Sequence, residues 1–228
     1  MGTYSGVSLQ DAISFEGVGV VVFHDFSLVI LVFILCIVGG MFWMIVEGGY
    51  NYAVVGYSSS NYLEFSWTML PVVVLAVLGL PSLMLIYIME GSFSSDLTFK
   101  SMGHQWYWSY ESGDFVDYGI DSYMVPTEDL EVGDFRLLEV DNSLVLPYLT
   151  KVRMVTSSTD VIHGWALPAM GLKVDSVPGR LNVLNLFSYK PGSYYGQCSE
   201  ICGINHSFMP IHVEFVGWSD FMSNMISA

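Results

Sequence analysis

Two long uncharged stretches dominate the N-terminal part of the chain. The first runs from Phe26 to Val46 and the second from Phe65 to Met89, and charged residues bound both. Helices of these lengths would reach about 31 and 37 Å, which is enough to cross a hydrocarbon layer of about 30 Å. A cleavable signal peptide fits the first stretch poorly, because it is long and no basic residue precedes it. The pattern predicts transmembrane helices at 26–46 and 65–89.

The residues around these stretches complete a hairpin. We expect an N-terminal segment at 1–25 and a connecting loop at 47–64, rich in Gly, Ser, Asn and Tyr. Pro71 and Pro81 lie inside the second stretch and should bend that helix, which a bilayer tolerates. The alternative, buried core helices of a soluble protein, would need two such stretches in succession. Neither the loop nor the N-terminal segment carries Lys or Arg, so the positive-inside rule gives no orientation.

Beyond residue 90 the pattern changes to short segments in which apolar and polar residues alternate. Residues 151–154 and 211–215 alternate strictly, whereas 136–140 and 180–187 are less regular but still typical of strands. Turn signals rich in Pro and Gly separate these segments. Many short strands at such spacing are typical of an antiparallel sandwich or barrel. We therefore expect one all-β domain at 90–228.

Composition agrees with a membrane protein that carries an acidic domain. The hydrophobic residues make up 53% of the chain, the charged residues only 13%, and the mean hydropathy is +0.51. Soluble domains average about 25% charged residues. All seven Lys and Arg residues lie at or beyond Lys100. The formal net charge of −15 argues against a nucleic-acid partner, because phosphate backbones bind Lys and Arg.

Soft metal-binding side chains cluster between Gly196 and Pro210. They are Cys198, Cys202, His206 and Met209. Their spacing would also suit one face of a helix, but the Gly and Pro residues favour a loop between two strands. Zinc binds Cys and His but has little use for a thioether, whereas copper at electron-transfer sites takes His, Cys and a weak Met. A single blue copper needs one cysteine, so two cysteines indicate thiolates that bridge two copper ions.

A second imidazole should come from elsewhere in the chain. His163 is the best candidate, because it follows an apolar pair and lies outside the membrane part. His104 and His212 are weaker candidates, since His212 is expected on the polar side of its strand. The alternatives for the loop are a structural zinc site and two inert buried cysteines beside a chance methionine. Cys36 lies within the first apolar stretch and is most simply a small packing residue.

The run from Gly196 to Ile211 resembles the copper A loop of the cytochrome c oxidase subunit II family. The resemblance extends over nearly the whole chain and implies a cupredoxin-like fold for the β-domain. Its other signature stretches are Gln10–Ala12, Phe23–Asp25, His104–Trp108, Asp121–Pro126, Arg136–Asn142 and Pro178–Asn182. The chain departs from the family at Met84, where an Arg is common, and at Glu16–Gly19. Neither departure touches the metal loop.

The resemblance also implies roles for individual residues. The implied copper A ligands are His163, Cys198, Glu200 (through its backbone carbonyl), Cys202, His206 and Met209. The two cysteines would bridge two copper ions, each histidine would bind one of them, and the methionine would be a weak ligand. The Glu200 carboxylate would bind a magnesium ion shared with the catalytic subunit I, since carboxylates suit that hard cation.

Three further features have both a simple and a functional interpretation. Trp106 fits an aromatic belt at a membrane surface, whereas the resemblance implies an exposed indole that passes electrons from cytochrome c toward copper A. Ten acids and one base lie between Glu111 and Asp141; they form a solvated face, and we expect them to attract a basic electron donor. Glu64 either marks a membrane boundary or, by resemblance, opens a proton pathway into the catalytic subunit.

These features predict a member of the family that takes electrons from cytochrome c and passes them to subunit I, which reduces oxygen to water and pumps protons. Other oxidase subunits and the lipid bilayer would be further partners. The short N-terminus, with no signal peptide, indicates the mitochondrial inner membrane, with the β-domain in the intermembrane space. The alternatives are a membrane-tethered copper-delivery module, a quinol oxidase subunit II without copper ligands, and a structural zinc domain on a membrane hairpin.

Overall fold

The computed structural model describes residues 8–47, 60–91, 94–115 and 118–227. The chain divides into two compact units. One unit contains residues 19–89, which belong to the two long helices and the loop between them. The other contains residues 1–18 together with 90–228, so the N-terminal segment belongs with the β-domain.

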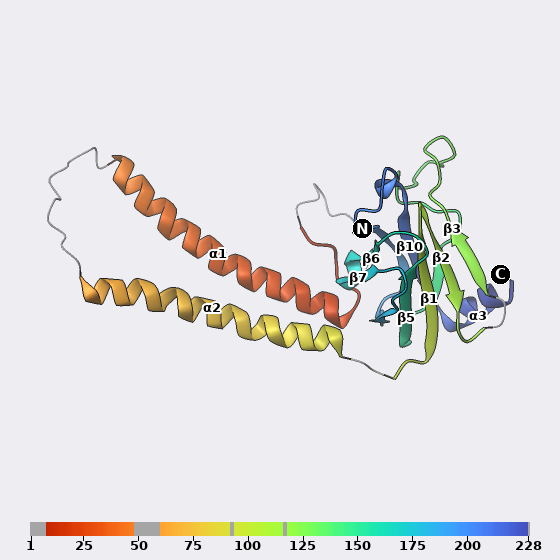
Figure 1. Cartoon of the computed structure of the whole chain (residues 1–228), viewed down its shortest axis with the longest axis horizontal. Helices are drawn as coiled ribbons and strands as arrows, with labels where there is room; N and C mark the ends of the chain where they lie inside the picture. The colour runs from red at the N-terminus through yellow and green to blue at the C-terminus, as the bar shows by residue number, and fades with distance from the viewer. Residues whose placement is uncertain (1–7, 48–59, 92–93, 116–117, 228) are drawn as a thin grey trace. The chain divides into compact units, whose positions relative to one another are not determined.

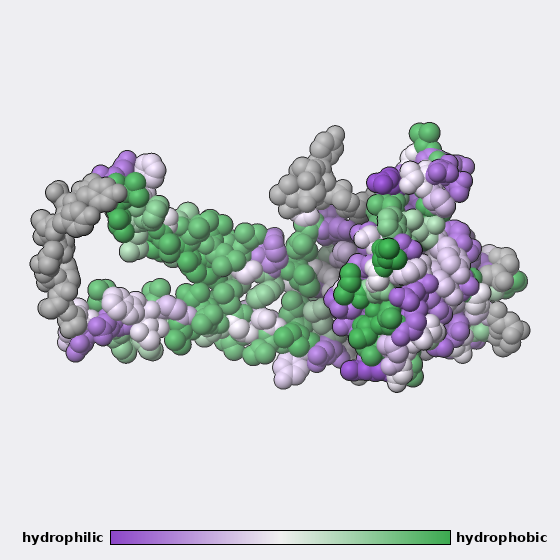
Figure 2. Space-filling model, turned by 45° about the horizontal axis from the view of Figure 1, so that its top comes forward, coloured by the Kyte–Doolittle hydropathy of each residue, from purple (hydrophilic) through white to green (hydrophobic). Residues whose placement is uncertain are grey.

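Two long helices, α1 (Phe15–Glu47) and α2 (Asn61–Glu90), contain the two predicted spans (Figure 1). Both are long and apolar enough to cross a membrane, and the most apolar window of each is not buried within the protein. Figure 2 accordingly shows apolar side chains exposed along both helices, whereas polar residues cover much of the β-domain. Pro71 and Pro81 lie inside α2, as predicted. Most of the predicted connecting loop lies outside the described residues.

Helix α1 begins at Phe15, eleven residues before the transmembrane helix predicted at 26–46. Ser14 explains the early start, because its Oγ accepts a hydrogen bond from the Gly17 N–H at 2.9 Å and thus caps the first turn. The same hydroxyl donates to the Met170 carbonyl at 2.8 Å. Ile13 adds two backbone hydrogen bonds, one to Ala169 and one from Tyr189. These bonds tie the N-terminal segment to the β-domain.

In the described part of the β-domain, ten strands form three sheets. Figure 1 shows how they are arranged. The strands are β1 (Leu97–His104), β2 (Tyr107–Ser112), β3 (Gly119–Ser122), β4 (Leu144–Pro147), β5 (Val152–Ser158), β6 (His163–Leu167), β7 (Leu172–Ser176), β8 (Asn182–Leu186), β9 (Gly192–Gln197) and β10 (Pro210–Val216). The sheet orders are β3-β2-β1-β5-β8, β4-β10-β9 and β6-β7. Strand β6 contacts β1 in the first sheet and β9 and β10 in the second. The described residues also form the 3₁₀ helices η2 (Pro168–Met170) and η3 (His206–Phe208) and the C-terminal helix α3 (Trp218–Ser227).

Two expectations about the strands were wrong in part. The β1–β5 and β4–β10 pairs are parallel, so the domain is a mixed sandwich rather than a wholly antiparallel one. Residues 136–138 form a turn rather than a strand, and Val140 makes an isolated antiparallel bridge with Met124. Leu137 adopts a positive φ of 69°, and the N–H groups of Leu138 and Glu139 both bond to the Phe135 carbonyl. The turn uses these two N–H groups itself, so pairing of residues 136–140 with another segment is limited to the bridge at Val140.

The core holds large side chains whose polar atoms are hydrogen-bonded. Burial alternates residue by residue along β1, which places one face of the strand inside. Trp108 and Trp165 are fully buried. The Trp165 indole N–H donates to the Tyr110 hydroxyl at 3.3 Å, and the Trp108 indole N–H donates to the Met209 carbonyl at 3.3 Å. The second bond ties the core directly to the loop between β9 and β10.

Candidate metal centre

The loop that carries both cysteines joins two paired strands. Strands β9 and β10 are antiparallel, and Gln197 pairs with Pro210, so the twelve residues between them are closed into a loop. This confirms the expectation of a loop rather than a helix. Gly203 has a φ of +129°, which favours glycine, and a Cβ there would lie 3.2 Å from the Trp106 ring. The loop therefore lies against the turn between β1 and β2.

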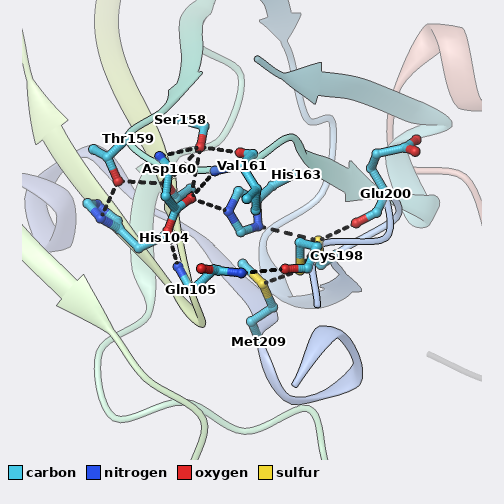
Figure 3. A network of polar contacts seen from close by, with 12 residues as sticks. His104, Gln105, Ser158, Thr159, Asp160, Val161, His163, Cys198, Glu200 and Met209 are labelled. Atoms are coloured by element: carbon cyan, nitrogen blue, oxygen red, sulfur yellow. Dashed lines mark hydrogen bonds and ion pairs between the residues drawn. The ribbon is translucent and has the colours of Figure 1, made fainter. Parts of the chain in front are cut away.

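The predicted soft ligands of this loop come together beside His163 of β6; Figure 3 shows Cys198, Met209 and His163. The Cys198 and Cys202 sulfur atoms are 3.9 Å apart. The His163 Nδ1 lies 4.0 Å from Cys198 Sγ, and the His206 Nδ1 lies 3.6 Å from Cys202 Sγ. The Met209 sulfur is 3.5 Å from Cys202 Sγ. Each cysteine sulfur thus lies within 4.0 Å of a histidine nitrogen, and Cys198 also interacts with His206.

This donor set fits copper. Both cysteines are free, and their sulfur separation is far longer than the roughly 2.05 Å of a disulfide. His163, Cys198, Cys202 and Met209 are each at most 6% exposed, so water is largely excluded. The Cys198 thiol also contacts the Glu200 carbonyl at 3.3 Å. Two thiols, two imidazoles, a thioether and a carbonyl form a predominantly soft site, which suits copper better than zinc.

His163 is oriented from its far side. It is the first residue of β6, and its Nε2 lies 2.9 Å from the Asp160 carboxylate, which leaves Nδ1 directed at Cys198. Gly103 provides room for the ring, because a Cβ there would lie 2.7 Å from it. Burial lowers the pKa of His163, but the hydrogen bonds with Cys198 and Asp160 outweigh burial and raise it. Asp160 therefore orients the imidazole ring and favours a proton on Nε2, which leaves Nδ1 free to bind a metal.

The two thiols have unequal acidity. Burial opposes ionisation of Cys198, but hydrogen bonds from His163 and from the Gly164 and Glu200 backbone lower its pKa to about 7. Burial and the neighbouring Cys198 charge raise the pKa of Cys202 to about 12. A single thiolate is therefore favoured without a cation, and a bound cation would be needed to hold two thiolates side by side.

Glu200 directs its two oxygen-bearing groups to different places (Figure 3). Its backbone carbonyl faces Cys198, whereas its carboxylate is 39% exposed and lies 3.8 Å from the Lys173 ammonium. Trp106 is half-buried rather than an exposed indole, because its ring packs beside Gly203. The Trp106 Nε1 is buried and finds no hydrogen-bond partner in the described parts of the chain. Glu64 belongs to the first turn of α2, where its charge stabilises the helix N-terminus.

The two weaker candidates, His104 and His212, are not placed to bind this metal. Both nitrogens of His104 lie 2.9 Å from hydroxyl groups, those of Ser109 and Thr159. His212 was expected on the polar side of its strand, and that expectation was wrong: it is only 7% exposed. It stacks on the Tyr195 ring at 4.3 Å, because β10 is the central strand of its sheet and is covered on both faces.

Two residues of the site were missed in the sequence. Asp160, the partner of His163, has a weak signal, since a carboxylate three residues before a candidate ligand histidine is a reasonable orienting group. Gln105 lies in the signature stretch His104–Trp108, but no local pattern predicts its contacts, because its partners are 55 and 97 residues away.

Comparison with known proteins agrees with this site and fold. The family model for the cytochrome c oxidase subunit II periplasmic domain matches residues 97–216, and that for the transmembrane domain matches residues 2–85. Cytochrome c oxidase subunit 2 of Drosophila yakuba is 46% identical over 97% of this chain and 96% of its own length. The Branchiostoma floridae protein of the same name is 46% identical, with coverage of 97% and 98%.

A solved structure of the same family also resembles the β-domain. The periplasmic domain of cytochrome oxidase subunit II from Bradyrhizobium japonicum is 44% identical, with a TM-score of 0.56, and the match covers 60% of this chain and 95% of that one. The family models match most of the chain, the relatives align along nearly its whole length, and the soft ligands meet at one site. On these grounds the chain belongs to the cytochrome c oxidase subunit II family.

Proposed function

We propose that this chain collects single electrons from cytochrome c at a binuclear copper A centre and passes them to the catalytic subunit I. The observation that carries the proposal is the arrangement of the two buried sulfur atoms, 3.9 Å apart, each within 4.0 Å of a histidine nitrogen. The residues that would hold the copper ions are His163, Cys198, Glu200 (by its carbonyl), Cys202, His206 and Met209. Two copper ions bridged by thiolates would supply a centre that gains and loses one electron with little rearrangement.

The chain's own residues keep this centre rigid and dry. Asp160 holds the His163 ring, and the ring packs edge-on against Trp108 at a centroid distance of 5.8 Å. The Trp108 indole also holds the Met209 carbonyl. Strands β9 and β10 anchor both ends of the loop. Ligands supported in this way move little between two charge states, which is the requirement for rapid electron transfer.

The alternative functions explain fewer of these contacts. A copper-delivery module needs exposed, exchangeable ligands, whereas four of the side-chain donors here are buried. A structural zinc domain leaves the Met209 thioether without a purpose. A quinol oxidase subunit II would lack the copper ligands.

Metal analysis and electron paramagnetic resonance of the assembled oxidase test the proposal. We expect two copper ions held by this chain that share one unpaired electron. Zinc in the loop, or a single isolated copper, would contradict the proposal. We also propose that the Glu200 carboxylate binds a magnesium ion shared with subunit I. A Glu200→Gln variant is then expected to keep both copper ions, since its carbonyl is unchanged, but to lose magnesium.

The acidic segment between Glu111 and Asp141 supports docking of a basic donor. Its exposed acids are Glu111, Asp114, Asp121, Glu128, Asp129, Glu131, Asp134 and Asp141. Trp106 lies beside this segment in the chain and packs against the copper loop at Gly203. We propose that cytochrome c docks here and that electrons pass through the Trp106 indole.

Ionic strength and a tryptophan variant separate docking from transfer. Raising the salt concentration from about 0.01 to 0.15 M shortens the screening length from about 30 to 8 Å. The bimolecular rate of reduction by cytochrome c should therefore fall in every variant. In the preformed complex, Trp106→Phe should slow transfer by about tenfold or more, equivalent to about 1.4 kcal/mol in the barrier. The matched control, Trp218→Phe at an exposed tryptophan, should leave the rate of transfer in the complex unchanged. A bimolecular rate for the parent protein that does not depend on salt would contradict the docking proposal.

Glu64 is proposed to open a proton pathway into the catalytic subunit. Its carboxylate is exposed in the first turn of α2, where a proton carrier could reach it. A Glu64→Gln variant should keep its helix and its copper but turn over more slowly. Normal turnover would leave only the stabilisation of the helix N-terminus as the role of Glu64.

We further propose that the chain lies in the mitochondrial inner membrane with its β-domain in the intermembrane space, where soluble cytochrome c could reach it. Two helices long enough to cross a membrane support the first part. Protease should then cut the β-domain in mitochondria that have lost their outer membrane, and digestion only from the matrix side would contradict this placement.

A further inference from the structure

Gln105 lies in the turn between β1 and β2, directly before Trp106 (Figure 3). Its backbone N–H donates to the Asp160 carboxylate at 2.7 Å. Its side-chain amide donates to the Cys202 carbonyl at 2.8 Å. One residue is therefore bonded to two segments that are 42 positions apart in the chain.

These two segments are the two halves of the metal centre. The Asp160 carboxylate holds the His163 ring at 2.9 Å, so the backbone bond of Gln105 supports the His163 side. The Cys202 carbonyl belongs to the residue whose thiol contacts His206 and Met209, so the amide bond supports the other side. Gln105 spans the centre without supplying a metal ligand.

Gly203 allows the metal loop to approach Gln105 closely. Its positive φ turns the loop toward the β1–β2 turn, and a Cβ there would lie 3.1 Å from the Gln105 amide nitrogen. Other side chains at position 105 would serve less well. Leucine has a similar size but no donor, and glutamate would present an oxygen to the Cys202 carbonyl.

We propose that Gln105 is a positioning residue of the metal centre, which holds the Cys202 side of the loop in register with the Asp160–His163 side and against Trp106. The inference rests on the proposed function, since it concerns the geometry of the copper A centre. The bond acts on the centre through the Cys202 peptide and not by contact with the metal. Its loss should therefore change the spectrum and the reduction potential more than the fold.

The test compares the assembled oxidase carrying the parent chain, Gln105→Leu, Gln105→Glu and Asn142→Leu. Asn142 is the matched control, because its side-chain amide also donates to a backbone carbonyl at 2.8 Å, that of Asp121, and neither residue belongs to the metal centre. The measurements are the electron paramagnetic resonance spectrum, the reduction potential of copper A, and the rate at which a chelator removes copper.

We expect Gln105→Leu to change the copper hyperfine pattern and to speed copper release by about twofold to tenfold, the range for one lost hydrogen bond. The reduction potential should fall in the order parent, Gln105→Leu, Gln105→Glu. Loss of a donor beside the Cys202 peptide favours the oxidised centre, and an added negative charge favours it further. Asn142→Leu should change none of the three measurements.

An unchanged spectrum and potential in Gln105→Leu would overturn the inference, as would equal changes in Gln105→Leu and Asn142→Leu. Absence of a two-copper signal in the parent itself is a different result. That outcome would refute the proposed function, and the inference would fall with it.

Discussion

Replacing either Cys198 or Cys202 with serine is expected to remove the two-copper signal and nearly abolish electron transfer from cytochrome c. The loss should exceed the roughly 10- to 100-fold that follows removal of a hydrogen-bond partner of a metal ligand. Serine has almost the size of cysteine, but its hydroxyl does not ionise near neutral pH and is a hard donor. Each variant also removes a sulfur that lies beside an imidazole, at 4.0 Å from His163 for Cys198 and at 3.6 Å from His206 for Cys202.

The third cysteine of the chain is the control for this experiment. Cys36 lies on α1, in the other unit, and Cys36→Ser should keep the copper signal and the turnover of the parent. Metal content, paramagnetic resonance and steady-state turnover are measured on all three variants. Full activity in either loop variant would mean that the two sulfur atoms do not jointly hold the metal.

Gly196→Ala should destabilise the β-domain by about 3 kcal/mol or more, at the upper end for overpacked cores. A Cβ at this position would lie 1.9 Å from the Ala166 carbonyl oxygen. The obstacle is backbone of β6, so no side chain can rotate away, and β9 must separate from β6. Gly196 lies two residues before Cys198, and His163 begins β6, so the separation would also pull the two ligands apart.

Thermal unfolding of the assembled protein and its copper content at low temperature measure the two effects. Gly119→Ala is the control, because Gly119 lies in a strand of the same domain and a Cβ there meets nothing within 4 Å. It should change the free energy of unfolding by no more than about 0.5 kcal/mol. If Gly196→Ala is as stable as Gly119→Ala, the close approach of β9 to β6 is not present in the protein.

The helices and the metal loop could be predicted because their signals are local. An apolar run of 21 or 25 residues has few stable solutions other than a membrane helix. The four soft donors of the loop lie within twelve residues, so their chemistry can be recognised without knowing the fold. The start of α1 was harder to place, since the Ser14 cap works together with a carbonyl 156 positions away.

Strand pairing and burial in the β-domain could not be predicted in the same way. The parallel pairing of β1 with β5 joins residues 55 positions apart, and no pattern within either strand specifies its partner. The alternation in β10 suggested an exposed His212, yet neighbouring strands and the Tyr195 ring cover it. Alternation shows which residues share a face, but only the packing of other elements shows whether that face is buried.

The residue types and their spacing along the chain were therefore enough to indicate a membrane hairpin, a β-domain and a copper loop. The sequence also singled out His163 as the second imidazole, but how Asp160 directs it and how Gln105 joins the two halves of the centre became visible only once distant segments were folded together. The physical reason is range. Hydrophobic runs and ligand clusters act over a few residues, whereas hydrogen bonds and steric contacts depend on distances in space that the order of residues does not state.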